Sequence, residues 1–328
     1  MISVLETCQP RTELLKGKFN PEIFTASLGP ILSYYRSGQA TVDTLYTNAE
    51  LFFREATYPT QGLKLALSEV FARLAGDVTV PAIHRLETAF GGGKTHTLIA
   101  CTHIAFRGKE LKEVTAGLLE PDLLPDPGSV AVVGVAGDEI PVHKPKGEAL
   151  VPYTLWGEIA YQIGGEQLYR EVGEEAQSHA APGRTYFEKV LGGRRVLIML
   201  DELAQYAARL EAARPDGASQ LAAFLMSLHG YARNHPGIAI VLTLASAADA
   251  FARQTERLTQ LLAEVSGEEI SADEALSLGH RAVRSVASVV SRDAVQITPV
   301  QGAEISSVLA KRLFTAVDRT AARETAEA

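Results

Sequence analysis

An α/β fold with a parallel five-stranded sheet flanked by helices is predicted by two features of the sequence. Short apolar runs of strand length alternate with longer stretches in which apolar residues recur at helical spacing, a pattern typical of β-α-β units. The central runs are also apolar without interruption, as expected for strands that are buried on both faces of a sheet. The five strands are expected at 78–86, 130–135, 196–200, 238–244 and 294–297.

Helices are predicted where apolar residues recur every three or four positions. One helix should follow directly after a glycine cluster at 91–93, and the polar stretch 137–152 should be a loop. The other helices are expected at 62–74, 155–163, 186–191, 221–228 and 249–262. A final helix is predicted within 302–317, on the apolar positions Ile305, Val308, Leu309, Leu313, Phe314 and Val317.

Composition excludes several classes of protein. With 46% hydrophobic and 21% charged residues among 328, the chain can build a core, so disorder as its main state is excluded. The formal net charge of −8 argues against a protein that wraps nucleic acid electrostatically, although a local basic patch stays open. The two cysteines, Cys8 and Cys101, provide neither a disulfide framework nor a zinc site. Without a basic leader or an apolar run of about 18 residues, a cytoplasmic protein without membrane association is expected.

The segment TAFGGGKT at 88–95 carries the strongest motif. It matches the phosphate-binding loop pattern GxxxxGK[ST], except that Thr88 stands where the pattern has its first glycine. Gly91, Gly92 and Gly93 are expected to bring backbone N–H groups against phosphate oxygens, assisted by the positive end of the following helix. A glycine-rich turn without a ligand is the alternative.

Lys94 and Thr95 complete this motif. Lys94 is expected to reach the β- and γ-phosphates of a nucleotide, and the Thr95 hydroxyl is expected to hold Mg²⁺. Phe90 and His96 are grouped with them as nucleotide-binding residues. For His96 a contact to nucleotide or to nearby carboxylates is one interpretation, and packing at the start of the helix is the favoured one.

A second motif lies about a hundred residues further on. The run VLIMLDE at 196–202 is an apolar strand that ends in two carboxylates, as in a Walker B motif. Asp201 is expected to bind Mg²⁺, and Glu202 to orient and polarise the attacking water. The alternative for Glu202 is an ordinary surface carboxylate.

The glutamate beside Asp201 is typical of P-loop NTPases with an additional strand between the Walker strands. The run 238–244 is predicted to be that strand, and Thr243 is its expected polar sensor beside the γ-phosphate, with Ser246 as the lesser candidate. In AAA+ ATPases an arginine placed like Arg292 points into the nucleotide site of a neighbouring subunit. Arg292 is therefore a candidate catalytic finger, with Arg281 and Arg284 as lesser candidates and a surface arginine as the alternative.

The chain resembles a family of large prokaryotic AAA+-type ATPases catalogued as domains of unknown function, which includes PglY-like proteins of phage-growth-limitation and BREX-type defence islands. The resemblance spans about residues 20–320, and FGGGKTH is its most specific element. The segments that carry it are ELFFREATYPTQGL at 50–63, ETAFGGGKTHTL at 87–98, LWGEIAYQIGG at 155–165, LIMLDELAQY at 197–206 and SRDAVQITPVQGAEISSVLAKRLF at 291–314.

This resemblance implies ATP as the nucleotide and a genomic setting beside DNA methyltransferases and restriction components. It assigns Lys94, Thr95, Asp201 and Glu202 as Walker residues. The chain is expected to be the N-terminal portion of a larger protein, because no later element covers the apolar face of the final helix, and the greater length of family members agrees with this. A complete two-domain protein with a frayed tail is the alternative. The expected organisation is an N-terminal extension (1–61), a P-loop ATPase α/β domain (62–298) and the start of a helical lid (299–328).

Three further residues and one segment are weighed between function and packing. Cys101 and His103 lie on different faces of the predicted helix, so both are expected in the core rather than on a metal. Trp156 is expected in the core rather than as a platform for a base. The segment 58–60 (Tyr-Pro-Thr) precedes the first strand, where AAA+ proteins often hold the adenine.

The leading functional hypothesis is an oligomeric AAA+-type ATPase, with ATP and Mg²⁺, that powers or gates a larger DNA-directed defence complex. Its partners would include DNA methyltransferase or restriction-type proteins, and direct DNA contact stays open. The second hypothesis is a nucleotide-dependent switch or scaffold with little turnover. A small-molecule kinase is disfavoured, because a helical lid and Arg292 suit oligomeric ATPases better.

Overall fold

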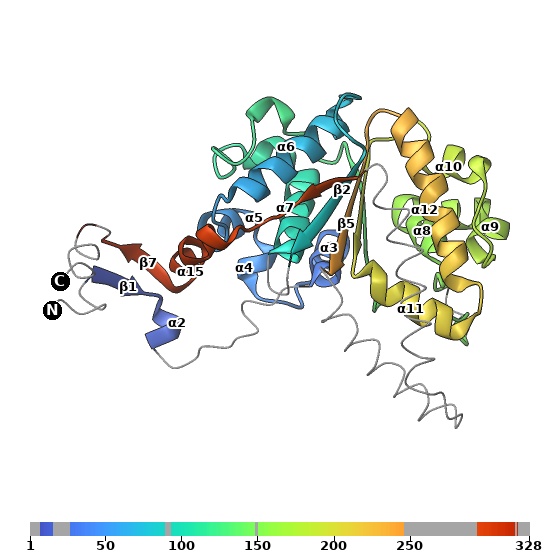
Figure 1. The fold of residues 1–328 in the computed structure, drawn as a ribbon, viewed down its shortest axis with the longest axis horizontal. Coiled ribbons are helices and arrows are strands. Elements are labelled where there is room, and N and C mark those ends of the chain that lie inside the picture. Colours follow the sequence, from blue (N-terminus) through green and yellow to red (C-terminus); the bar gives the residue numbers. More distant parts are fainter. Residues whose placement is uncertain are drawn as a thin grey trace, which may run out of the picture.

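A computed structural model describes residues 7–15, 27–88, 93–147, 150–245, 294–318 and 320. A five-stranded sheet forms its centre, with every neighbouring pair of strands parallel and the order β3-β4-β5-β2-β6 (Figure 1). The strands are β2 (Ile83–Thr88), β3 (Ala131–Ala136), β4 (Val196–Asp201), β5 (Ile238–Ala245) and β6 (Val295–Ile297). All five predicted strands are confirmed, and β5 lies between β2 and β4 as predicted.

The first strand starts later than its apolar run suggested. The prediction placed it from residue 78, but Asp77 accepts hydrogen bonds from both the N–H and the hydroxyl of Thr79, which closes a turn there. The strand β2 begins only at Ile83.

Helices cover both faces of the sheet (Figure 1). Four predicted helices are confirmed within longer ones, namely 62–74, 155–163, 186–191 and 221–228. The predicted loop 137–152 contains no helix or strand in its described part. The predicted helix 249–262 lies outside the described residues. The longer helices are α3 (Leu28–Ser37), α6 (Gln61–Ala75), α7 (Lys94–Arg107), α8 (Leu155–Glu171), α10 (Arg184–Leu191), α11 (Leu203–Ala213), α12 (Gly217–Asn234) and α15 (Ile305–Leu313). The short elements are α2 (Thr12–Leu15), α4 (Thr44–Thr47), α5 (Ala49–Leu51), α9 (Gly173–Gln177), a π-helical turn (Phe52–Ala56) and 3₁₀ turns at Gly108–Leu111, Pro121–Leu123 and Gly302–Glu304.

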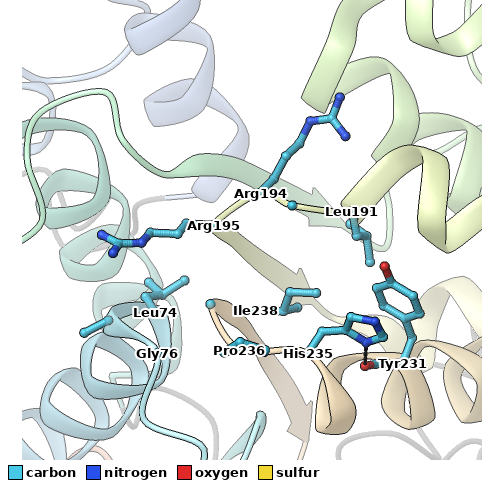
Figure 2. A pocket seen from close by; sticks show the side chains of 12 residues that line it. Leu74, Gly76, Leu191, Arg194, Arg195, Tyr231, His235, Pro236 and Ile238 are labelled. Carbon is cyan, nitrogen blue, oxygen red and sulfur yellow. Dashed lines mark hydrogen bonds between the residues drawn. The ribbon is translucent and has the colours of Figure 1, made fainter.

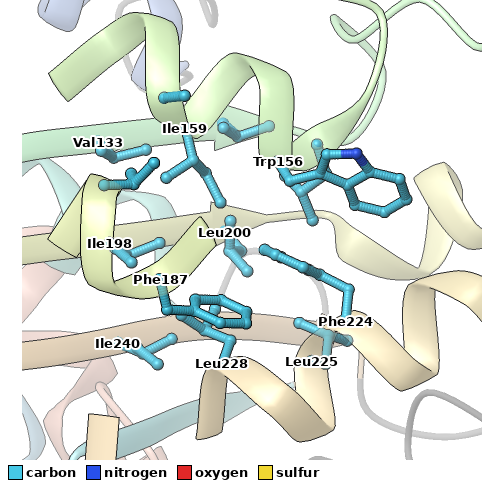
Figure 3. Close-up of a cluster of buried hydrophobic side chains, with 14 of the residues drawn as sticks. Val133, Trp156, Ile159, Phe187, Ile198, Leu200, Phe224, Leu225, Leu228 and Ile240 are labelled. Carbon is cyan, nitrogen blue, oxygen red and sulfur yellow. The ribbon is translucent and has the colours of Figure 1, made fainter. Parts of the chain in front are cut away.

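Alternate residues of β3, β4 and β5 enter two separate hydrophobic clusters. In β4, Ile198 and Leu200 face the cluster formed with α8, α10, α11 and α12, which Figure 3 shows around Trp156. Leu197 and Met199 face the opposite cluster, formed with α3, α6 and α7. Trp156 is 2% exposed, and its indole N–H lies 2.9 Å from the Glu175 carbonyl oxygen, so its predicted place in the core is confirmed.

The second cluster also contains residues from the segment that precedes α6. Leu28, Ile31 and Leu32 of α3 and Phe52 of the π-helical turn are buried there together with Leu98 of α7. This segment therefore contributes to the packing of one face of the sheet. The division of the chain into 1–61, 62–298 and 299–328 remains a prediction.

The predicted final helix is wrong in its second half. Helix α15 ends at Leu313, and the next residues form β7 (Phe314–Val317), which pairs antiparallel with β1 (Cys8–Pro10) at one end of the molecule (Figure 1). Backbone hydrogen bonds from Arg11 N–H to the Leu313 carbonyl oxygen and from Asp318 N–H to Thr7 extend this pairing. The helical spacing of Phe314 and Val317 was misleading, because a partner strand from the other end of the chain satisfies their backbone instead.

Within the described ranges, none of the helices combines the length and the apolar character that a membrane span requires.

The edge strand β3 is closed by a side-chain amide. Gln162 of α8 accepts from the Gly134 N–H and donates to the Gly134 carbonyl oxygen, both at 2.9 Å. Its Oε1 also accepts from Arg36 at 2.6 Å. An amide side chain thereby replaces the neighbouring strand that an edge strand lacks, which protects the edge from adventitious pairing.

Gln162→Leu should lower the free energy of unfolding by about 1–3 kcal/mol, because it leaves both backbone groups of Gly134 without a partner. Urea denaturation measures this loss. Gln167→Leu is the matched control, since Gln167 lies exposed on the same helix. Equal losses in the two variants would show that the amide does not stabilise the edge.

Candidate functional site

Three strands bring polar side chains to one place at the carboxyl edge of the sheet. Helix α7 begins there, after β2, while β4 and β5 end there in Asp201 and close to Thr243. Leu86 pairs with Thr243 across β2 and β5, and Leu200 pairs with Leu242 across β4 and β5. Because side chains alternate along a strand, Asp201 and Thr243 share the face on which α7 packs.

Gly93 provides the start of α7. Its φ of +81° is a left-handed conformation, and it stands at the N-cap position. A Cβ at this position would lie 3.0 Å from Val300 Cγ2, so both the backbone and the space favour glycine. The sequence predicted glycine where the backbone needs a positive φ, and Gly93 has such a φ. The other predicted residues of the loop, Phe90, Gly91 and Gly92, lie outside the described residues.

The carboxylate of Asp201 is the centre of the site. It is 7% exposed, and it accepts hydrogen bonds from the Thr95 hydroxyl (3.2 Å to Oδ2), the Thr243 hydroxyl and the Glu202 N–H (3.1 Å to Oδ1). Burial raises the pKa of Asp201, while these hydrogen bonds and the charge of Lys94 oppose that rise. The predicted neighbours Thr95 and Asp201 are thus in direct contact.

Glu202 adopts a left-handed backbone, with φ +51°, and is the one non-glycine residue with positive φ in the part of the chain described. Its N–H lies 3.0 Å from the Thr243 hydroxyl oxygen. A Cβ on Gly137 would lie 2.2 Å from the Glu202 carbonyl oxygen, so the turn after β3 packs directly against it. Such a conformation costs about 1–2 kcal/mol in a residue with a Cβ, and the surrounding contacts hold it in place.

The side chain of Glu202 is exposed. Desolvation has the largest effect on the pKa of Glu202 and raises it. The negative charges of Asp201 and Asp138 raise this pKa further, while the charge of Lys94 lowers it. A carboxyl group whose pKa is raised in this way is a stronger base once ionised.

The ammonium group of Lys94 lies among carboxylates. Partial burial lowers the pKa of Lys94, and the charges of Asp201, Glu202 and Glu87 act in the opposite direction. Lys94, Thr95, Asp201, Glu202 and Thr243 were predicted as site residues from separate parts of the sequence, and the structure brings them together. Ser246, Arg281, Arg284 and Arg292 lie outside the described residues.

His96, in the same first turn of α7, contacts residues outside the group around Asp201. Its ring stacks on Phe52 at 4.4 Å between centroids, and its nitrogens contact the Thr57 hydroxyl (3.0 Å) and Arg312 (3.2 Å). Burial has the largest effect on the pKa of His96, and together with the charge of Arg312 it holds this pKa well below its usual range. His96 thus packs at the start of the helix, as the favoured interpretation has it, while a contact between His96 and a nucleotide stays a prediction.

In the segment 58–60, suggested to hold the adenine, the Thr60 side chain forms hydrogen bonds to two backbone groups. The Thr60 hydroxyl accepts from the Leu63 N–H at the start of α6 and donates to the Pro299 carbonyl oxygen at 2.6 Å. Thr60 is 2% exposed, whereas Pro59 is exposed. An adenine contact at 58–60 stays a prediction.

The loop after β3 holds two acidic residues that the sequence analysis missed. Asp138 is close enough to raise the pKa of Glu202 and of Glu139. The Glu139 carboxylate lies against the first turn of α3, where a Cβ on Gly29 would be 2.4 Å from it. Their position could have revealed them, because they follow a buried strand at the same edge as Asp201.

Cys101 and His103 belong to the core, as predicted. His103 contacts the Tyr35 hydroxyl at 2.7 Å and the Tyr46 carbonyl oxygen at 3.0 Å. Burial lowers the pKa of His103 to about 3 and raises that of the Cys101 thiol to about 12. Over the ranges that the structure describes, no group of three or more His, Cys, Asp or Glu residues is arranged to hold a metal ion.

A cavity of about 420 Å³ lies at the opposite edge of the sheet, where β5 begins at Ile238 (Figure 2). Tyr231 and His235 of its wall stack at 3.8 Å between ring centroids. Arg194 also borders the cavity, but its guanidinium donates to carbonyl oxygens near the end of α10. This cavity is separate from the group around Asp201.

A family model for the DUF499 N-terminal domain matches residues 20–266, which is well over half of the chain. The chain belongs to the DUF499 family. The matched region includes the whole group of residues around Asp201. It begins at residue 20, as the resemblance described from the sequence does, but it ends at residue 266 rather than near 320. No curated protein and no solved structure matches the chain.

Glu202→Gly should be more stable than Glu202→Gln by about 0.5–1 kcal/mol, because glycine adopts a left-handed conformation without the penalty of a Cβ. Both variants remove the carboxylate, so their difference isolates the backbone. The midpoints of urea denaturation at equal slope measure it. If the glycine variant were the less stable one, the local strain inferred for Glu202 would be absent.

Proposed function

We propose that this chain is an ATP-binding and ATP-hydrolysing module of the additional-strand (AAA+) class of P-loop NTPases. The observation that carries the proposal is the contact between the Thr95 hydroxyl, in the first turn of α7, and Asp201, at the end of β4. In P-loop NTPases the threonine or serine after the loop lysine and the Walker B aspartate hold the same Mg²⁺ ion. Two residues 106 positions apart in the sequence meet here as that chemistry requires.

The order of the strands supports this class. Strand β5 lies between β2, which leads toward the glycine cluster, and β4, which ends in Asp201. This is the position expected for an additional strand, and Thr243 near its end contacts both Asp201 and the Glu202 N–H. A small-molecule kinase needs neither this strand nor a second carboxylate at position 202.

Nucleotide phosphates would bind at the start of α7. The helix has 14 residues, so its N–H groups and its dipole favour an anion at Gly93. Lys94 adds a positive charge beside them, and the charges of Asp201 and Glu202 favour the charged form of its amine. ATP is the nucleotide that the resemblance implies.

The chemistry of the donors suits Mg²⁺. Thr95 and Asp201 offer a hydroxyl and a carboxylate oxygen, the hard ligands that Mg²⁺ prefers, and Mg²⁺ is commonly held by one or two protein groups together with substrate phosphates. When bound, the ion would neutralise charge on the β- and γ-phosphates. It would also compensate the buried charge of Asp201.

Glu202 is the proposed general base. Its carboxylate is exposed to the space beside Lys94 and can accept a proton from the attacking water. Thr243 is the proposed positioning group, because its hydroxyl links the Asp201 carboxylate to the Glu202 backbone. Together they would fix the direction from which water approaches.

The wider role is proposed from the resemblance. The module would act in the cytoplasm as a homo-oligomer, with Arg292 reaching a neighbouring nucleotide site. It would power or gate a DNA-directed defence complex with DNA methyltransferase or restriction-type partners. The net charge of −8 favours partners, rather than this module, as the main DNA-binding surface.

Lys94→Ala should weaken binding of MgATP at least about 100-fold, because it removes the charge on the β- and γ-phosphates. Isothermal titration calorimetry on the folded protein measures this affinity. Lys112→Ala, at an exposed lysine, is the control and should bind as the unaltered protein does. Unchanged affinity in Lys94→Ala would overturn the nucleotide site.

Glu202→Gln should keep MgATP binding and lose turnover about 100-fold or more, because the amide cannot accept the proton of water. Steady-state phosphate release measures it, with Glu113→Gln at an exposed glutamate as the control. If the unaltered protein binds ATP with negligible release, the switch or scaffold is the correct function. Turnover that survives in Glu202→Gln would require a different base.

A further inference from the structure

One side chain joins the last turn of α15 to the first turn of α7. The Arg312 guanidinium contacts His96 Nδ1 at 3.2 Å and the Tyr46 hydroxyl at 2.8 Å, and it lies 5.7 Å from the centre of the Tyr46 ring. His96 stands directly after Thr95 in the sequence. Arg312 thus connects the C-terminal helix to the turn that carries Lys94 and Thr95.

The hydrogen bonds around His96 determine which ring nitrogen carries the hydrogen. The Thr57 hydroxyl donates its one hydrogen to the Phe52 carbonyl oxygen at 2.9 Å, so it accepts from His96 Nε2 at 3.0 Å. His96 Nδ1 is then the acceptor for Arg312, whose guanidinium has only donors. His96 Nε2 therefore donates to Thr57, which directly follows the π-helical turn, and His96 Nδ1 accepts from Arg312 of α15.

A second contact joins the same C-terminal segment to the other side of the turn. Val300 Cγ2 lies over Gly93, 3.0 Å from where a Cβ would be. Between Val300 and α15, the Glu304 carboxylate accepts from the Gln61 N–H at 2.9 Å. The segment 299–312 therefore touches the residues on both sides of Lys94 and Thr95 and is itself anchored to the start of α6.

We propose that Arg312 is a positioning residue that couples the placement of α15 to nucleotide binding, acting through His96 on the first turn of α7. This inference rests on the proposed function, because it names the regulation of the same site. The planar guanidinium suits the role, since its fixed donors reach His96 and Tyr46 at once. By linkage, a nucleotide that orders this turn favours the docked position of α15, and undocking of α15 weakens the nucleotide.

Arg312→Gln tests the coupling, with Tyr46→Phe as the matched control that removes the Tyr46 hydroxyl and leaves Arg312 and His96 in place. In Arg312→Gln the Kd for MgATP, from titration of the whole chain by calorimetry, should rise about tenfold, the scale of one hydrogen bond from a charged donor. Tyr46→Phe should bind within about twofold of the unaltered protein. Equal affinity in all three proteins would overturn the coupling while leaving nucleotide binding in place.

A double-variant cycle tests the route through His96. In a His96→Gln background, Arg312→Gln should have no additional effect on the Kd, because the residue through which it acts is already gone. Losses that add would overturn this route. If the unaltered protein did not bind MgATP, the proposed function itself would be overturned.

Nitrogen-15 NMR of labelled histidines gives a readout that needs no nucleotide. The His96 resonances, identified by their absence in His96→Gln, should show hydrogen on Nε2, and the Nδ1 shift should change in Arg312→Gln but not in Tyr46→Phe. Hydrogen on Nδ1 in the unaltered protein would overturn the arrangement on which the inference depends.

Discussion

The buried carboxylate of Asp201 is the group on which the arrangement of the site depends. Its hydrogen-bond donors come from α7, from β5 and from its own turn, so one side chain holds together the three elements that meet at the carboxyl edge. A buried carboxylate without partners would be costly, which makes these contacts a condition for placing Asp201 there at all. The same contacts fix Glu202, because Thr243 donates to Asp201 and lies next to the Glu202 N–H. Structure and proposed chemistry therefore share one set of hydrogen bonds.

Sequence alone could predict the sheet and the centre of the site. Buried parallel strands are continuous apolar runs, and the polar residue that ends such a run lies at a known edge, so Asp201, Thr243 and the start of α7 could be placed together before any coordinates. The apolar run of β5 followed from the same pattern, whereas its place between β2 and β4 was predicted from the NTPase class that the glutamate beside Asp201 indicated. The acidic pair at 138–139 obeys this rule as well, but it was absorbed into a polar loop and overlooked.

What the sequence could not predict depends on contacts between distant segments. Phe314 and Val317 have helical spacing, yet pairing with β1, some 300 residues earlier, makes their segment a strand. The left-handed backbone of Glu202 has no local sequence signature either, because its contacts come from Gly137 in the turn after β3 and from Thr243 in β5. Local periodicity records burial, but it does not record which distant partner supplies the hydrogen bonds.

Segments from before β2 and from after β6 pack against the first turn of α7. Phe52 and Thr57 come before β2, and Arg312 comes after β6, but all three meet at His96. A Cβ on Gly62 would lie 1.9 Å from the Thr298 carbonyl oxygen, so the start of α6 also packs directly on the C-terminal segment. Side-chain contacts therefore continue across both predicted boundaries, at 61 and at 298. The C-terminal segment therefore contacts the first turn of α7 on both sides of Lys94 and Thr95, at Gly93 through Val300 and at His96 through Arg312.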